Sequence, residues 1–115
     1  MKILNKSSKK EICSEYKMCS NPLSKAMGLM FSRRKNEFCL LFTFKKEQHI
    51  DLHMLFVFYP IDVVFLDSEK KVVELKKSFK PFTLYATKHK MKYFLELPKG
   101  RIDDKKIKIA DELQF

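Results

Sequence analysis

The longest apolar stretch of the chain runs from residue 49 to residue 67 and contains mainly aromatic and β-branched side chains. Such side chains fit a buried, pleated surface. Pro60 lies in the middle of the stretch and has no N–H group to donate to a neighbouring strand. The pattern therefore predicts a strand near 52–58, a bend at Tyr59 and Pro60, and a second strand near 61–66.

Further segments of strand length are either apolar on both faces or alternate between apolar and charged positions. They lie at 38–44, 72–77, 82–86, 93–97, 107–109 and 113–115. Residues 23–31 predict one short helix at most. Short strands at regular spacing with so little helix predict a mainly β protein. We expect a compact β-sandwich or partly open barrel of about seven short strands, with at most one or two short helices.

A chain of 115 residues has the usual length of one domain. Residues 1–20 mix lysine, serine and glutamate with isolated apolar positions, and they predict an N-terminal arm or an edge segment. Residues 21–115 predict a single β-rich domain.

The net charge of +10 is unevenly distributed, because a weakly acidic centre separates two basic flanks. Lysine-rich surfaces often serve solubility alone, but such a charge also attracts polyanions. Two basic loops lie close to aromatic residues, an arrangement that is typical of proteins that hold single-stranded nucleic acid. The candidate nucleic-acid-binding residues are Arg33, Arg34, Lys88, Lys90 and Lys92.

The three cysteines, Cys13, Cys19 and Cys39, form no Cys-x-x-Cys pair. An odd number without such a pair argues against a disulfide scaffold and for a reducing compartment. The first ten residues contain no apolar run of signal-peptide length, and the central apolar stretch is too short to span a bilayer. We therefore expect a cytoplasmic protein with no membrane partner.

Three segments together resemble the domain-of-unknown-function 192 family of bacteria and archaea. The matching residues are Ala26 to Phe31, His53-Met54 with Pro60 to Asp67, and Tyr93 to Gly100. The resemblance implies a compact β-sandwich-like domain and no particular activity, since the family has no agreed biochemical function. The chain departs from the family pattern at His53, where many members have tryptophan, and at Ala110, where glycine is common.

Asp62 and Glu96 are carboxylates embedded in strand-like apolar segments, and His53 precedes the first of them. If these side chains share a cleft, they could bind a polar ligand or perform acid–base chemistry. Alternatively, Asp62 accepts backbone N–H groups near Pro60 and Glu96 faces water. His49 and His53 alternate along one strand, but no third residue stands at a spacing diagnostic of a metal site, so no metal is predicted.

The chain contains no P-loop and no dinucleotide-binding motif, so no cofactor is predicted. The leading hypothesis is a binding or interaction module for a polar small molecule or a protein, with ligand-binding residues His53, Asp62 and Glu96. One alternative is an enzyme that uses a cleft lined by the same residues. Another is a nucleic-acid-binding module that uses the basic loops.

Overall fold

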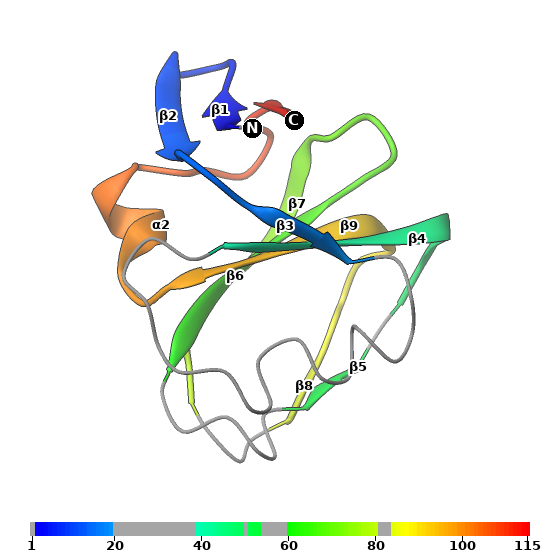
Figure 1. The fold of residues 1–115 in the computed structure, drawn as a ribbon. Helices are drawn as coiled ribbons and strands as arrows, with labels where there is room; N and C mark the ends of the chain where they lie inside the picture. Colours follow the sequence, from blue (N-terminus) through cyan, green and yellow to red (C-terminus); the bar gives the residue numbers. More distant parts are fainter. Residues whose placement is uncertain (1, 20–38, 50, 54–59, 81–83) are drawn as a thin grey trace.

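The structure is a computed structural model that describes residues 2–19, 39–49, 51–53, 60–80 and 84–115. Its centre is a five-stranded sheet in the order β3-β4-β9-β6-β7 (Figure 1). Its strands pair antiparallel, except that β3 runs parallel to β4. Their bounds are Lys17–Cys19 for β3, Leu40–Gln48 for β4, Met91–Pro98 for β9, Ile61–Leu66 for β6 and Val72–Phe79 for β7.

Smaller layers lie on the two faces of this central sheet. The upper layer in Figure 1 contains a sheet of order β10-β1-β2 and the short helix α2. The lower layer contains the antiparallel pair β5-β8. The bounds are Leu113–Gln114 for β10, Ile3–Asn5 for β1, Lys10–Cys13 for β2, Arg101–Asp104 for α2, Asp51–His53 for β5 and Leu84–Ala86 for β8.

The two faces of the central sheet carry two separate hydrophobic clusters. Leu41, Val64 and Leu95 belong to the upper cluster, together with residues of β1, β2 and α2. Phe42, Phe65 and their neighbours form the lower cluster, against which Tyr85 of β8 packs. Because both faces are covered, every residue of β6 is buried. The predicted mainly β, sandwich-like class is confirmed, and α2 is the helix that the described part of the chain contains.

Most of the predicted strands that fall on described residues are present. The predicted strand at 61–66 is β6, and those at 72–77 and 93–97 extend slightly further as β7 and β9. Residues 107–109, however, form no strand, because they lie in the turn region that follows α2. Ile107 is buried, and its N–H group donates to the carbonyl of Ile102 at 3.0 Å. The proposed helix at 23–31 and most of the strand at 52–58 lie outside the described residues.

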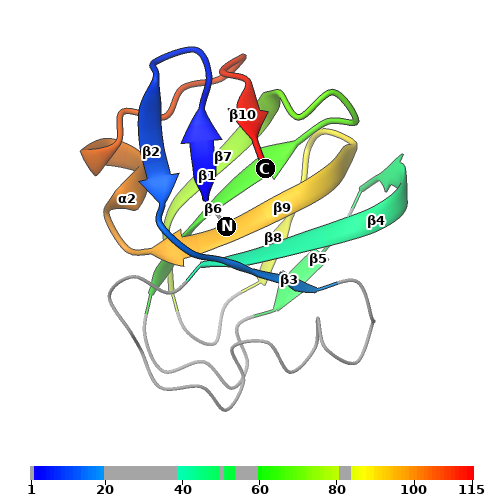
Figure 2. The same cartoon turned by 45° about the horizontal axis from the view of Figure 1, so that its top comes forward.

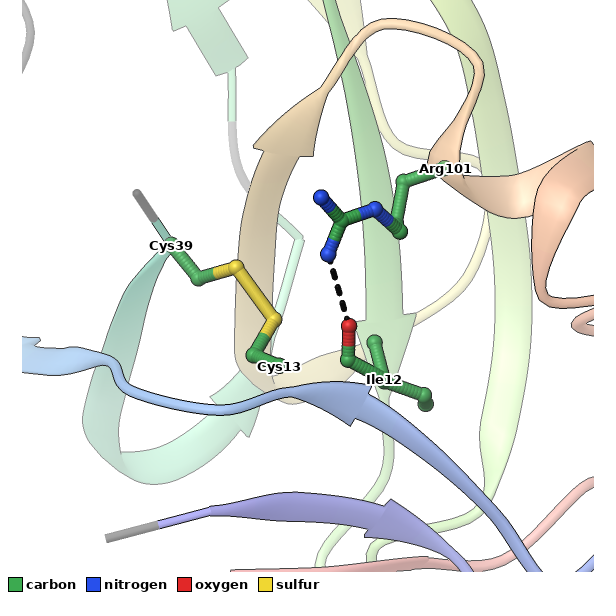
Figure 3. Close-up of a disulfide and its surroundings, with 4 residues drawn as sticks. All are labelled: Ile12, Cys13, Cys39 and Arg101. Atoms are coloured by element: carbon green, nitrogen blue, oxygen red, sulfur yellow. Dashed lines mark hydrogen bonds between the residues drawn. A yellow bond between two sulfur atoms is a disulfide. The ribbon is translucent and has the colours of Figure 1, made fainter. Parts of the chain in front are cut away.

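The cysteine count argued against a disulfide scaffold, yet Cys13 and Cys39 are joined by a disulfide (Figure 3). Cys13 ends β2 and Cys39 precedes β4, so the disulfide ties the upper sheet to the central sheet. Their Cα atoms lie 6.7 Å apart although 26 positions separate them in sequence. An odd cysteine count cannot reveal such a pair, because only the tertiary fold brings the two residues together.

Within the described residues, no helix is long and apolar enough to cross a membrane.

Candidate functional site

Asp62 lies in the second position of β6, on the upper face of the central sheet, and is 1% exposed. Its carboxylate accepts the backbone N–H groups of Ser78 at 2.9 Å, Gly100 at 3.1 Å and Ile102 at 3.0 Å. Ser78 and Gly100 both have positive φ angles, 51° and 88°. A non-glycine residue with positive φ is strained, and a specific hydrogen bond helps to hold it there. Asp62 therefore anchors the irregular part of β7 and the start of α2.

Glu96 lies near the end of β9, on the lower face of the same sheet. The register pairs it with Leu40 on one side and Val63 on the other. Its Oε2 atom is buried and has no hydrogen-bond partner among the described residues. Burial raises the pKa of Glu96 to about 8, because a carboxylate that loses contact with water is destabilised relative to the neutral acid. Near neutral pH this carboxyl group is therefore mostly protonated.

The strand register separates the two carboxylates. Asp62 pairs with Leu97, whereas Glu96 pairs with Val63. Since successive side chains of a strand point to opposite faces, Asp62 and Glu96 lie on opposite sides of the sheet. One cleft therefore cannot be lined by both, as the sequence-based hypothesis required.

His53 ends β5, where its backbone pairs with that of Leu84 in β8. The β5-β8 pair lies below the central sheet in Figure 1, which is the side that Glu96 faces. The structure describes only the backbone of His53. It thus brings the strand of His53, and not Asp62, to the side of Glu96.

Glu74 of β7 is a buried carboxylate that the sequence pattern did not single out, because alternation along 72–77 made it look solvent-facing. It is 6% exposed. It accepts hydrogen bonds from the hydroxyl of Tyr85, from the backbone N–H groups of Lys88 and His89 at 2.9 and 3.0 Å, and from the ring of His89. Burial by itself would raise the pKa of Glu74, but these hydrogen bonds outweigh it and lower the pKa.

Tyr85 connects β8 to the lower face. Its ring stacks on Phe65 with centroids 5.8 Å apart and meets Phe79 edge-on at 6.1 Å. Burial, together with the neighbouring Glu74 carboxylate, raises the pKa of Tyr85 to about 12. Tyr85 therefore fastens the β5-β8 pair over the β6-β7 half of the sheet.

Arg101 is a second residue that the sequence analysis missed. It opens α2 and is 9% exposed, and its guanidinium donates to the carbonyl oxygen of Ile12 at 2.8 Å, beside the disulfide (Figure 3). An open polar pocket adjoins it, with acidic and basic side chains in equal number. The pocket is lined by Glu11, Ile12, Ser14, Arg101, Asp104 and Lys105. This balance of charge gives the pocket no preference for an anion or a cation.

The candidate nucleic-acid-binding residues are only partly described. Arg33 and Arg34 lie outside the described residues. Lys88 and Lys90 are exposed in the turn before β9, and Lys92 is half-buried within that strand.

Fold and site together define a small three-layer β protein whose central sheet carries, on one face, a carboxyl group with a buried oxygen that has no hydrogen-bond partner in the described part of the chain. The chain belongs to the DUF192 family, described as "Uncharacterized ACR", whose family model matches residues 3–115. A UPF0127 protein of Pyrococcus furiosus is 36% identical over 115 residues, which cover 98% of this chain and 97% of that protein. A UPF0127 protein of Thermococcus sibiricus is 33% identical, with coverage of 98% and 73%.

Two solved structures share the fold. A putative transcription regulator of Sinorhizobium meliloti superposes with a TM-score of 0.84 at 18% identity, covering 98% of this chain and 89% of that one. A protein of unknown function from Novosphingobium aromaticivorans superposes with a TM-score of 0.85, also at 18% identity, covering 99% and 82%. At this level of identity the likeness shows the fold alone.

Proposed function

We propose that the protein is a binding module that holds a polar small molecule against the lower face of its central sheet, with Glu96 as the recognising group. The observation that carries the proposal is the buried Oε2 atom of Glu96, which has no hydrogen-bond partner among the described residues. A buried polar atom without a partner is costly, and native proteins rarely keep one that serves no purpose. Strongly perturbed carboxyl groups are concentrated at functional sites.

The surroundings of Glu96 indicate the chemistry of the ligand. The described neighbours of Glu96 on the lower face are apolar, and Phe42 and Phe94 stack there with ring centroids 4.4 Å apart. A site of this kind suits a ligand with an apolar body and one polar group. A protonated carboxyl donates a hydrogen bond to a ligand oxygen. A ligand amine would instead take up the proton and form an ion pair with the carboxylate.

Catalysis receives less support from this geometry. The acid–base alternative needs a second titratable group close to Glu96. Asp62 cannot supply this group, since Asp62 lies on the other face and accepts hydrogen bonds from three backbone N–H groups.

A cytoplasmic location also stays a prediction. Because the protein contains the Cys13–Cys39 disulfide, a cytoplasmic location fits only cells whose intracellular proteins form disulfides.

A thermal-shift screen with ring-bearing amines, alcohols and amides would test the proposal. We expect one of these probe classes to raise the melting temperature of the wild-type protein and to lose that effect in Glu96→Gln. Glu15→Gln is the matched control, because Glu15 is exposed and its replacement should leave the shift unchanged. Shifts that are equal in the wild type and in Glu96→Gln, or the absence of any shift across all three classes, would contradict the proposal.

A further inference from the structure

A second surface with a distinct chemistry lies at the other end of β9, where the strand begins. Five lysines gather there, from the end of β4, from the turn at 87–90 and from β9 itself. We call this surface the lysine end, and it consists of Lys45, Lys46, Lys88, Lys90 and Lys92.

The strand register brings these lysines together. β4 and β9 pair regularly as far as Thr43 and Tyr93, and the next pair is Gln48 with Met91. The residues 44–47 therefore form a large bulge opposite the single residue Lys92, and this bulge carries Lys45 and Lys46. The end of β4, the start of β9 and the turn between β8 and β9 lie along the same edge of the molecule (Figure 2).

The turn that carries Lys88 and Lys90 is held from below by a buried group. Glu74 accepts the backbone N–H groups of Lys88 and His89. The ring of His49, which follows β4, lies 3.3 Å from the carbonyl oxygen of Thr87. These contacts fix the turn against β7 and against the residue that follows β4, so the backbone that carries the lysines has little freedom to move.

The carboxylates near the lysine end are engaged elsewhere. Glu74 is buried beneath the turn. Glu47 accepts the N–H group of Ser68 at 2.8 Å, and Glu69 pairs with Lys71 at 3.5 Å. Among the described residues, no carboxylate forms an ion pair with any lysine of the lysine end. Exposed, unpaired like charges repel one another, and a bound polyanion relieves that repulsion.

The kind of basic side chain at the lysine end indicates which part of a polyanion it can contact. The lysine ammonium group acts as a point charge toward a phosphate. The planar guanidinium of arginine can instead donate two parallel hydrogen bonds to one acceptor group, including the edge of a base. Within the described residues no arginine lies at this end, since Arg101 follows the opposite end of β9 and is buried. Lysines alone suit the sugar–phosphate backbone and carry no sequence information.

We propose that the lysine end binds the phosphate backbone of nucleic acid without sequence preference. The lysine end lies at the start of β9, whereas Glu96 lies near the end of that strand, so this contact is separate from the proposed ligand site.

Fluorescence anisotropy can measure the affinity for a labelled oligothymidine of about 20 nucleotides between about 20 and 200 mM salt, and this measurement tests the proposed binding of nucleic acid. The first variant replaces Lys45, Lys46, Lys88 and Lys90 by glutamine. The matched control makes the same change at exposed lysines on β2 and after β9, and thus removes the same charge from the total of +10. Its replaced residues are Lys10, Lys99, Lys106 and Lys108.

We expect the wild type to bind with an affinity that falls steeply with salt. The lysine-end variant should lose about tenfold or more at low salt, and its log–log salt slope should shrink by about 3, roughly 0.7 for each lost contact with a single strand. The control variant should lose much less. Equal losses in the two variants would overturn the proposal, as would undetectable wild-type binding at the lowest salt or tighter binding of heparin than of nucleic acid. If the fourfold variant melts at a lower temperature than the control, the double variant K88Q/K90Q replaces it.

Discussion

Asp62 and Glu96 are carboxylates in two adjacent strands of the central sheet, β6 and β9, and they lie one position apart in the register. Their surroundings nevertheless differ. On the upper face, Asp62 accepts three backbone N–H groups, and the layer above is tied down by a disulfide. On the lower face, Glu96 has a buried oxygen without a partner among the described residues.

The difference shows that burial alone does not reveal what a carboxylate does. A buried carboxylate whose oxygens are filled by N–H donors stabilises the fold, and its removal leaves those donors unsatisfied. A buried carboxyl without partners lowers stability, and it is retained where a ligand supplies the missing contact. The same side-chain type therefore has a structural role on one face and is a candidate for binding on the other.

The largest expected effect is on the upper face. Asp62→Ala should lower the free energy of unfolding by about 4 kcal/mol, because three backbone N–H groups lose their acceptor and none can reach water easily. Urea denaturation followed by circular dichroism measures the change. If Asp62→Ala lowered the free energy of unfolding by less than about 1 kcal/mol, the effect would be that of an ordinary surface substitution. The structural role of Asp62, and with it the difference between the two faces, would then be refuted.

The disulfide should account for the next largest effect. Cys13→Ser combined with Cys39→Ser is expected to lower the free energy of unfolding by about 3 kcal/mol, the usual value for a loop of this length. Hydrogen exchange should speed up more in β1, β2 and β10 than in β9, because the disulfide ties the upper sheet to the centre. Cys19→Ser is the control, since Cys19 lies outside the disulfide. Uniform acceleration in all strands would show that the disulfide does not act on the upper layer in particular.

The smallest expected change concerns Glu96 and depends on pH. Its folded pKa of about 8 lies above the ordinary value of 4.5, so the folded state keeps a proton that the unfolded state releases. The stability that the protonated form supplies is present below the unfolded pKa and is lost as the pH rises toward 8. Glu96→Gln should therefore be about as stable as the wild type at pH 4, and more stable by about 2 kcal/mol at pH 8, where partial opening to water limits the gain.

Denaturant melts at the two pH values measure this difference. Glu15→Gln, the same change at an exposed position, is the control. If Glu96→Gln differed from the wild type by the same amount at both values, Glu96 would ionise normally in the folded protein, and the lower face would lose its distinction from the upper one.

The sequence by itself determined the class of fold and several strands, because alternation and β-branched composition are local properties. It also singled out Asp62 and Glu96 as carboxylates in apolar settings, and the resemblance marked position 110 as one where glycine is common. The structure gives Ala110 a φ angle of 75°, the conformation that glycine adopts most easily.

Only the tertiary structure decided which carboxylate has partners, which cysteines pair, and that Glu74 is buried. Each of these depends on contacts between segments that are distant in sequence, such as Asp62 with Gly100 and Cys13 with Cys39. A shift of one residue in the register between β6 and β9 would place Asp62 and Glu96 on the same face of the sheet. The local pattern does not determine the register between β6 and β9, since it follows from packing both faces of the central sheet at once.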